Sequence, residues 1–144
     1  MIVRKANLAD VTRILELYEQ LTEEVQDLSP EMVNRVFTEI DSSPRQELLV
    51  AEHEGLVVGT LFVQITPNLS HGARPWAVLE NMVVDIRYRR QGTGRLLIEY
   101  AFARCREVGC YKVQLLSHKK RLGAHQFYRS LGFEESASGF RFYF

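Results

Sequence analysis

One stretch of the sequence constrains the fold of this chain more than any other. In it, an apolar, strand-like run is followed by a basic turn that contains glycines and then by an amphipathic segment. The apolar run covers residues 79–86, and the turn reads Arg89, Arg90, Gln91, Gly92, Thr93, Gly94 and Arg95. N–H groups at the start of a helix have no partner inside the helix, and the helix dipole adds partial positive charge there. Glycines let the main chain approach a ligand closely. The segment therefore predicts an anion-binding site, most naturally for phosphate oxygens.

Two common phosphate-binding motifs do not fit this turn. A dinucleotide-binding fold needs a third glycine where this chain has Leu97, and a nucleotide-triphosphate loop needs a Gly-Lys-Ser/Thr run that the chain lacks. The pattern that remains is Arg/Gln-x-x-Gly-x-Gly/Ala, matched by Arg89, Gly92 and Gly94 behind a Val-Val strand.

A second segment lies nearer the C-terminus and matches the pattern A-x-x-F-Y-x-x-x-G-F. Its fixed positions are Ala124, Phe127, Tyr128, Gly132 and Phe133. The two motifs share no local chemistry, so their order and spacing are independent observations. Together they resemble the acetyl-CoA pyrophosphate loop and the C-terminal signature of the GCN5-related N-acetyltransferase (GNAT) superfamily. Residues 109–112, 121–133 and the aromatic tail look similar to compact members that act on aminoalkylphosphonates and amino-sugar phosphates.

Hydrophobic periodicity predicts a mixed α/β fold in the order β-α-α-β-β-β-α-β-α-β. Helices are expected after the caps Asn7 and Ser29, from Leu96 to a stop at Gly109, and over 122–131 with Gly132 as cap. Strands are expected over 2–4, 48–53, 56–66, 76–86, 111–116 and 140–144, with a tight hairpin at Glu54 and Gly55. This order resembles the GNAT acyl-CoA N-acyltransferase fold over residues 1–144, taken as a single N-acetyltransferase domain.

Composition narrows the class of protein further. The chain has 144 residues, with 18 Lys and Arg against 18 Asp and Glu, and the zero net charge argues against nucleic-acid binding through bulk charge. Two cysteines imply no disulfide framework, and the four scattered histidines have no metal-ligand spacing. No signal-like N-terminus and no run of about 18 apolar residues is present, so we expect a cytoplasmic protein without a membrane anchor.

The resemblance implies how the donor, acetyl-CoA, would be held. Backbone N–H groups from Gln91 to Arg95 would bind its pyrophosphate, with Arg89 and Arg90 nearby, and β-strand main chain would bond its pantetheine arm. The residues so implied are Met82, Val83, Val84, Arg89, Arg90, Gln91, Gly92, Thr93, Gly94, Arg95 and Phe127. The alternative is that the glycines only shape a turn between strand and helix, with solvated arginines around it.

Acetyl transfer to an amine also needs a neutral nucleophile. An alkyl amine with a pKa near ~10.4 is neutral in roughly one molecule of a few thousand at pH 7, which adds about 4–5 kcal/mol to the barrier unless a base helps. Glu80 is the candidate base, because it leads into the phosphate turn. Relatives that acetylate hexosamine phosphates carry a Glu here followed by an acidic residue, where this chain has Asn81. Strand alternation separates the two side chains unless a bulge intervenes, and Glu80 could instead serve only a structural neighbour.

The departing thiolate needs a proton, and Tyr128 is the candidate donor. A phenol with a pKa near ~10 stays protonated at neutral pH, and the family uses the tyrosine of this pair in that role. The alternative is a core aromatic in the stripe that contains Phe127, which we expect to lie mainly in the core. Cys105 fits the apolar face of its helix, with no base paired to it.

The sequence thus predicts an enzyme that moves an acetyl group from acetyl-CoA to a primary amine of a small molecule by direct attack. By resemblance, residues 67–75 and the first two helices would frame the acceptor entrance. A protein N-terminal or lysine acetyltransferase and a non-catalytic acyl-CoA-binding regulatory domain remain open. A homodimer through the aromatic tail, residues 140–144, also remains open.

Overall fold

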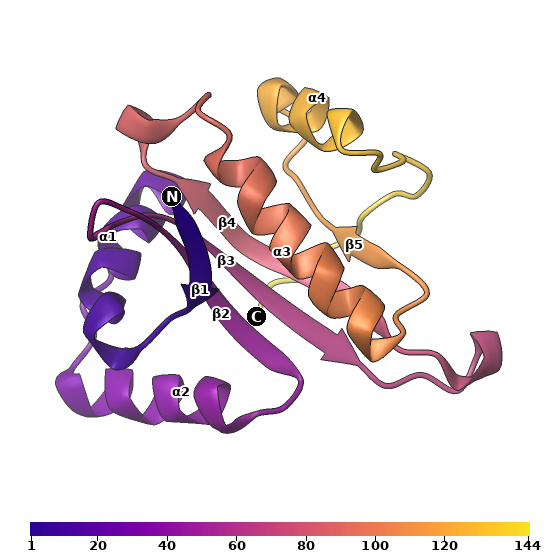
Figure 1. Ribbon diagram of the computed structural model, residues 1–144, viewed down its shortest axis with the longest axis horizontal. Coiled ribbons are helices and arrows are strands. Elements are labelled where there is room, and N and C mark those ends of the chain that lie inside the picture. The colour runs from indigo at the N-terminus through magenta and orange to yellow at the C-terminus, as the bar shows by residue number, and fades with distance from the viewer. The chain divides into compact units, whose positions relative to one another are not determined.

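The computed structural model describes all residues, 1–144, and they form two compact units, 1–114 and 115–144. The first unit contains three helices and the sheet, whose last strand crosses the boundary by one residue, Leu115 (Figure 1), and the second contains the fourth helix and the C-terminal tail. The strands are β1 (Ile2–Lys5), β2 (Gln46–His53), β3 (Leu56–Thr66), β4 (Trp76–Val84) and β5 (Val113–Leu115). The α-helices are α1 (Val11–Thr22), α2 (Pro30–Ser42), α3 (Thr93–Val108) and α4 (Leu122–Ser130), with short 3₁₀ segments at Leu8–Asp10, His71–Ala73 and Ile86–Tyr88.

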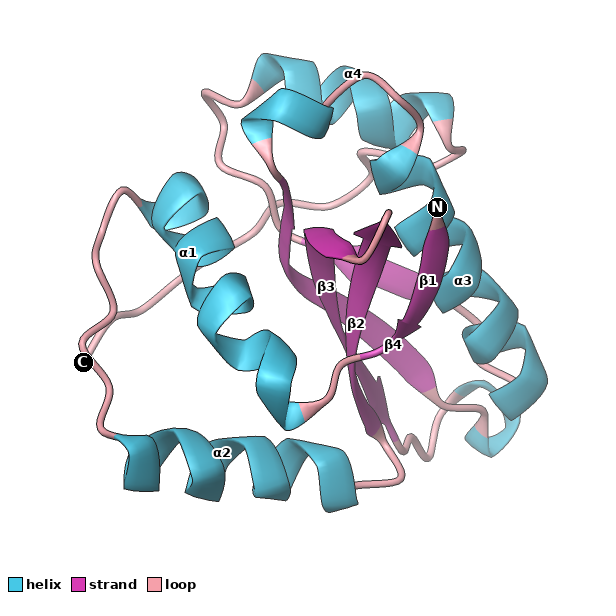
Figure 2. Ribbon diagram, turned by 60° about the vertical axis from the view of Figure 1, so that its left-hand side comes forward, coloured by secondary structure: helices cyan, strands magenta, loops and turns pink.

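The five strands follow one another across the sheet in sequence order. β1 to β4 pair antiparallel, whereas β4 and β5 are joined by the α3 crossover, which makes the sheet mixed. Main-chain bonds from Tyr111 N to Pro75 O and from Ala77 N to Lys112 O, both 3.0 Å, hold the start of β5 against β4. In the first unit α1 and α2 cover one face of the sheet and α3 covers the other (Figure 2). The mixed α/β fold expected from the sequence is confirmed.

The core lies between the central strands and the helices on either face. Leu49, Val50 and Ala51 are consecutive residues of β2, and all three are fully buried. Such a continuous apolar run is expected of a strand that is covered on both faces. From the helices, α1 adds Ile14 and Leu17, and α3 adds Leu97, Ile98, Ala101 and Cys105. Through these buried residues α3 packs directly on the sheet, which includes the strand that precedes α3 in the chain.

Local signals read from the sequence explain where the elements begin and end. The hairpin residues Glu54 and Gly55 have φ values of 50° and 81°, as a two-residue turn with both centres left-handed requires. Asn7 forms the expected capping box, and Ser29 accepts a bond from Met32 N at 3.2 Å at the start of α2. Gly109, at φ 85°, ends α3. These predictions are confirmed.

The C-terminal tail is where the sequence-based prediction was wrong. Residues 140–144 form no strand, although their aromatic alternation is typical of one. A strand needs a hydrogen-bonded neighbour, and the tail is not among the five paired strands of the sheet. Its side chains are exposed, namely those of Phe140, Phe142, Tyr143 and Phe144. β4 is also shorter than predicted, because the chain turns at Asp85 into the 3₁₀ segment.

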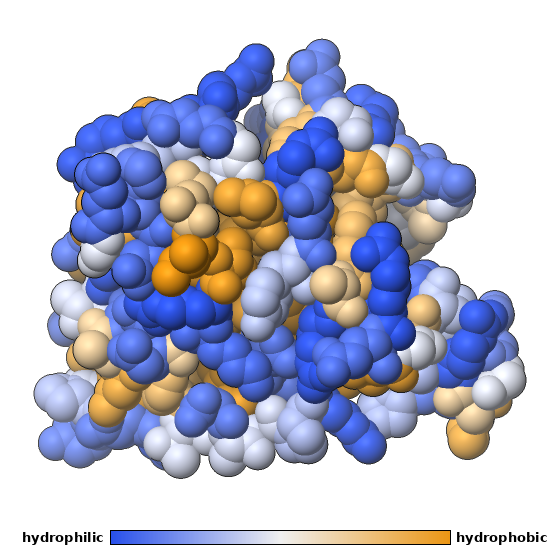
Figure 3. Space-filling model, in the orientation of Figure 1, coloured by the Kyte–Doolittle hydropathy of each residue, from blue (hydrophilic) through white to orange (hydrophobic).

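Polar and apolar side chains both lie on the surface of the protein. Figure 3 shows charged and polar side chains over most of one face, with apolar patches between them. Ile2, Leu69 and Ile86 are among the exposed apolar residues, and single apolar residues of this kind are normal on a protein surface. None of the helices combines the length and the hydrophobicity that a membrane-spanning segment needs.

Candidate functional site

The turn between β4 and α3 has the backbone of an anion-binding loop. Arg90 and Gly92 adopt left-handed conformations, with φ values of 63° and 86°. Left-handed residues in such a turn gather successive N–H groups on one concave side. Gly92 is the N-cap of α3 and provides no side-chain cap, and the first helical bond runs from Leu96 N to Gly92 O at 3.0 Å. The N–H groups of the first helical turn thus have no capping side chain and are available to a phosphate.

Three side chains of the turn make hydrogen bonds to the backbone of the segment before it. Arg89 donates from Nε to Val84 O at 3.0 Å, so one edge of its guanidinium is fixed to the end of β4. Gln91 donates from Nε2 to Arg87 O at 3.3 Å. Thr93 is buried, and its hydroxyl donates to Tyr88 O at 3.4 Å. Thr93 therefore has only its main chain to offer a ligand.

Gly59, in β3, is a site residue that the sequence analysis missed. A Cβ at this position would lie 3.2 Å from Leu97 Cδ1, 3.2 Å from Thr93 Cγ2 and 3.3 Å from Val83 O. The absence of a side chain thus lets the first turn of α3 approach the sheet. A glycine inside a strand pattern is the available signal for such close approach.

A β-bulge interrupts β4 next to the candidate base. Thr60 pairs with Val83 and Phe62 pairs with Glu80, so the one residue between the β3 partners faces two on β4. One of these two, Asn81, has φ 51°, a conformation that costs a residue with a side chain of order 1–3 kcal/mol. In a regular strand Glu80 and Asn81 would point to opposite faces of the sheet, but the bulge removes this requirement. Both residues are exposed.

Tyr18, on α1, lies beside this bulge. Its hydroxyl interacts with the side chains of Asn81 and Thr60, and burial raises the pKa of Tyr18 to about 12. Thr60 is itself buried and donates from its hydroxyl to Leu49 O at 2.8 Å. In the sequence, Tyr18 repeats with Ile14 and Leu21 at helical spacing, and such an apolar pattern by itself indicates no polar role.

The predicted pantetheine strand presents its main chain rather than its side chains. Val83 is buried in the cluster that contains Leu17 and Val57, so only its backbone can meet a ligand. Met82 and Val84 are half-buried. A bulge leaves the strand ladder locally disrupted, and the main chain of β4 is therefore the polar surface available beside Glu80.

In the second unit, α4 ends in a way that explains its sequence motif. Gly132 has φ 91°, and Phe133 N and Gly132 N bond to Tyr128 O and Arg129 O at 3.1 Å and 3.0 Å. This is the Schellman arrangement, which brings the residue after the glycine onto the last turn of the helix. The rings of Tyr128 and Phe133 are accordingly 5.7 Å apart, and those of Phe127 and Tyr128 5.4 Å. Burial raises the pKa of Tyr128, against a smaller opposing effect of Arg121.

The structure thus brings together the predicted residues in two groups. Glu80 and residues 82–95 follow one another along β4 and the turn of the first unit, and Phe127 and Tyr128 are neighbours on α4 of the second. Residues 67–75 lie at the start of β4, roughly 30 Å of strand away from the turn that follows its other end. No group of three or more His, Cys, Asp or Glu side chains is arranged to hold a metal ion.

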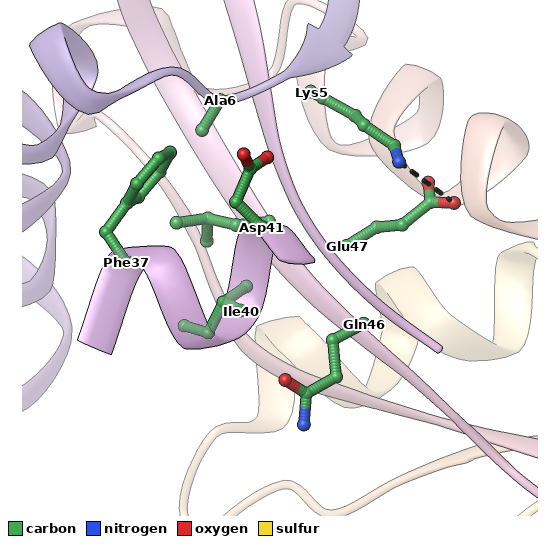
Figure 4. A pocket seen from close by; sticks show the side chains of 8 residues that line it. Lys5, Ala6, Phe37, Ile40, Asp41, Gln46 and Glu47 are labelled. Carbon is green, nitrogen blue, oxygen red and sulfur yellow. Dashed lines mark ion pairs between the residues drawn. The ribbon is translucent and has the colours of Figure 1, made fainter. Parts of the chain in front are cut away.

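A small pocket beneath α2 is too small to be a substrate site. It has a volume of about 10 Å³, which is the space of a single water molecule. Figure 4 shows Phe37, Ile40 and Asp41 on α2 facing it, with the ion pair between Lys5 and Glu47 at 3.8 Å nearby. This pocket reflects packing of α2 on β2.

Comparison with known proteins identifies the family. A model of the acetyltransferase (GNAT) family matches residues 11–133. The chain belongs to this family. It is 33% identical over 125 residues, 87% of this chain and 83% of the relative, to glucosamine 6-phosphate N-acetyltransferase of Trypanosoma brucei brucei.

Two solved structures extend the GNAT likeness to the whole chain. A candidate acetyltransferase of Agrobacterium tumefaciens str. C58 has a TM-score of 0.93 and 33% identity, covering 99% of each chain. Glucosamine-6-phosphate N-acetyltransferase of Arabidopsis thaliana has a TM-score of 0.90 and 28% identity, covering 99% of this chain and 97% of that one. The chain is accordingly an acetyl-CoA-dependent N-acetyltransferase, and both the family and the fold inferred from its motifs are confirmed.

Proposed function

We propose that this GNAT enzyme acetylates the primary amine of a small molecule by direct attack on acetyl-CoA, with Glu80 as base and Tyr128 as proton donor. The observation that carries the proposal is the uncapped first turn of α3, preceded by the left-handed residues Arg90 and Gly92 and by the bulged strand. This combination offers main-chain donors for phosphate and a disrupted strand for an amide-bearing arm.

Residues of β4 and the turn would hold the donor. The N–H groups from Gln91 to Arg95 bind the pyrophosphate in this proposal, and the free edge of Arg89 adds charge. Met82, Val83 and Val84 bond the pantetheine amides through their main chain. Acetyl-CoA supplies an activated thioester, and the chain supplies its position.

Glu80 would receive the proton that the amine loses. It is exposed beside the bulge, and its neighbour Asn81 is uncharged, so Glu80 is the carboxylate of this pair. As the amine nitrogen bonds to the carbonyl carbon, the carbon–sulfur bond breaks. Tyr128 then gives its hydroxyl proton to the sulfur, which balances the proton taken by Glu80. The raised pKa of Tyr128 keeps that hydroxyl protonated at neutral pH.

The names of the relatives select the first acceptor to test. The matched proteins of Trypanosoma and Arabidopsis are glucosamine 6-phosphate N-acetyltransferases, and we propose an amino-sugar phosphate as the acceptor class. A protein N-terminus or lysine is the second candidate acceptor, carried by the same chemistry on a larger amine.

The test measures release of free CoA thiol from acetyl-CoA with a panel of amines. The panel contains amino-sugar phosphates, aminoalkylphosphonates, aminoglycosides, polyamines and short peptides. Turnover with one small amine, at least about 100-fold slower in Tyr128→Phe and in Glu80→Gln, would support the proposal. Tyr100→Phe, on the exposed face of α3, is the matched control. Turnover of peptides alone would overturn the small-molecule assignment, and full activity of Tyr128→Phe would overturn the proton donor.

A further inference from the structure

Two side chains of α1 reach the segment that leads into the phosphate turn. Arg13 and Gln20 are seven residues apart, two helical turns, and so share one face of α1. Gln20 Oε1 accepts a bond from Ile86 N at 3.0 Å. Arg13 Nη2 donates to Oδ2 of Asp85, the residue that follows β4. One helix thus holds two consecutive residues of the connection between strand and turn.

Asp85 is the centre of this arrangement. It is fully buried, and Oδ1 accepts Arg87 N at 2.9 Å and Arg87 Nε at 3.1 Å while Oδ2 accepts Arg87 Nη2 at 2.9 Å. Its own main chain donates to Val58 O and accepts from Tyr88 N, both at 2.8 Å. A buried carboxylate needs such partners. Arg13 is the inner partner, because its side chain is 18% exposed whereas that of Arg87 is 67% exposed.

Arg13 is itself held in one orientation. Its Nε donates to Val57 O at 3.0 Å, and its Nη1 donates to Glu16 Oε2 at 2.7 Å. With Asp85 as the third partner, the guanidinium joins α1, β3 and the connection after β4. A lysine could keep the charge toward Asp85 but could not make all three contacts at once.

The clamped segment is connected in turn to the anion-binding residues. Tyr88 O accepts the hydroxyl of Thr93, and Arg87 O accepts the side chain of Gln91. These bonds join two inner residues of the turn, Gln91 and Thr93, to residues that Asp85 holds. Arg90 lies between residues 87–88 and these two residues, and its backbone is left-handed. Such a conformation persists only when the surrounding structure enforces it.

We propose that Arg13 and Gln20 are positioning residues that hold residues 85–88, and through them the turn 89–95, in the conformation that binds the phosphates of CoA. This inference rests on the proposed placement of acetyl-CoA at the turn. It makes α1 a determinant of donor affinity, although α1 contributes no residue to the turn. Replacing Gln20 removes one hydrogen bond to this segment and should have the smaller effect on CoA binding. Replacing Arg13 removes the ion pair with Asp85 and should have the larger effect.

The test is the dissociation constant of CoA, measured by calorimetry without any acceptor. We expect Arg13→Met to weaken CoA binding about 10-fold or more, since hydrogen bonds to charged groups are strong, Gln20→Leu to weaken it about 3-fold, and Arg13→Lys to lie between wild type and Arg13→Met. In turnover assays the KM for acetyl-CoA should rise while kcat at saturation stays near the wild-type value. The matched control is Arg104→Met, which removes an arginine that pairs with the buried Glu47 at 2.6 Å and also with Glu107, near the far end of α3.

The outcomes separate this inference from the proposed function. Wild-type protein that binds no CoA would remove the proposed donor site, and the inference with it. Wild-type binding that is unchanged in both Arg13→Met and Gln20→Leu, or weakened equally in Arg104→Met, would overturn the inference alone. If Arg13→Met does not fold, the CoA affinity of Gln20→Leu tests the inference. This variant should fold, because Gln20 is exposed and the Ile86 N–H can donate to water instead.

Discussion

At the scale of single residues, Gly59 determines how closely α3 can approach the sheet, because it has no side chain. The space that a Cβ would need is taken by Leu97, Thr93 and the Val83 carbonyl. Two of these neighbours belong to the first turns of α3. The position of the helix N-terminus, and of the donors it presents, therefore depends on this one glycine.

We expect Gly59→Ala to weaken both the fold and the donor site. The added methyl would force neighbours apart by a few tenths of an ångström, and overpacking of this kind costs about 1–3 kcal/mol. Denaturant unfolding and a CoA titration would measure the two effects. Gly123→Ala is the control, because a Cβ there meets nothing within 4 Å. Equal stability and CoA affinity of Gly59→Ala and wild type would contradict the assigned role.

The two cysteines should differ in reactivity. Burial raises the pKa of Cys105 to about 12, and burial also raises the pKa of the less buried Cys110. The thiolate is the reactive form, so iodoacetamide at pH 8 should label Cys110 first and Cys105 only after unfolding. Mass spectrometry of the labelled peptides would show the order. Rapid labelling of native Cys110→Ser protein, which retains only Cys105, would contradict it.

At the scale of the elements, the motifs were predictable where backbone geometry demands a particular residue. Gly92 and Gly132 occupy left-handed positions. Gly132 was predicted as the cap of the last helix, whereas Gly92 was predicted to lie in the turn before a helix beginning at Leu96, and α3 in fact begins at Thr93, directly after it. The Phe after Gly132 is explained by the Schellman contact with Tyr128. The bulge was harder to predict, because Asn81 lies in an otherwise regular apolar strand and only the tolerance of asparagine for left-handed backbone hints at it.

We expect Asn81→Val to remove the bulge or destabilise the strand. A β-branched residue is a poor occupant of φ 51°, and the change should cost about 1–3 kcal/mol and lower kcat as Glu80 shifts. Asn81→Gly keeps the backbone conformation accessible, so it should retain the stability of wild type. Thermal unfolding and steady-state kinetics distinguish the pair. A valine variant as stable and active as the glycine variant would show that the bulge has no functional part.

At the scale of the whole molecule, two buried carboxylates should make the fold sensitive to acid. Hydrogen bonds from Arg87 hold the pKa of Asp85 well below its usual range, and those from Arg4 lower the pKa of Asp10. A carboxyl with a lowered folded pKa stabilises the protein above its unfolded pKa, near ~3.9, and loses that contribution as pH falls toward the folded pKa.

The free energy of unfolding in urea should therefore be steady from pH 7 to about 5 and fall steeply below about pH 4. Asp10→Asn should be less stable than wild type at pH 7 and show a shallower decline in acid. Circular dichroism at a series of pH values would measure both curves. A wild-type unfolding free energy at pH 3 equal to that at pH 7 would falsify this assignment of the two carboxylates.

The sequence could predict the order of elements, but not the contacts that join distant parts of the molecule. Arg13 and Asp85 are 72 positions apart, and no local pattern marks either as the partner of the other. The aromatic tail shows the opposite limit. Its alternation describes a suitable strand, whereas strand formation depends on a neighbour that residues 140–144 do not have.

The phosphate turn has one consequence for how such a protein can vary. Its proposed donors are main-chain N–H groups, which every amino acid except proline carries. Replacement of a side chain such as that of Arg95, whose ion pair with Glu99 lies within α3, would therefore leave the donors intact, provided that the left-handed backbone at positions 90 and 92 is kept. Selection at this turn would act on the backbone conformation more than on the identity of each side chain. Proline would be the most damaging single replacement, because it has no backbone N–H to donate.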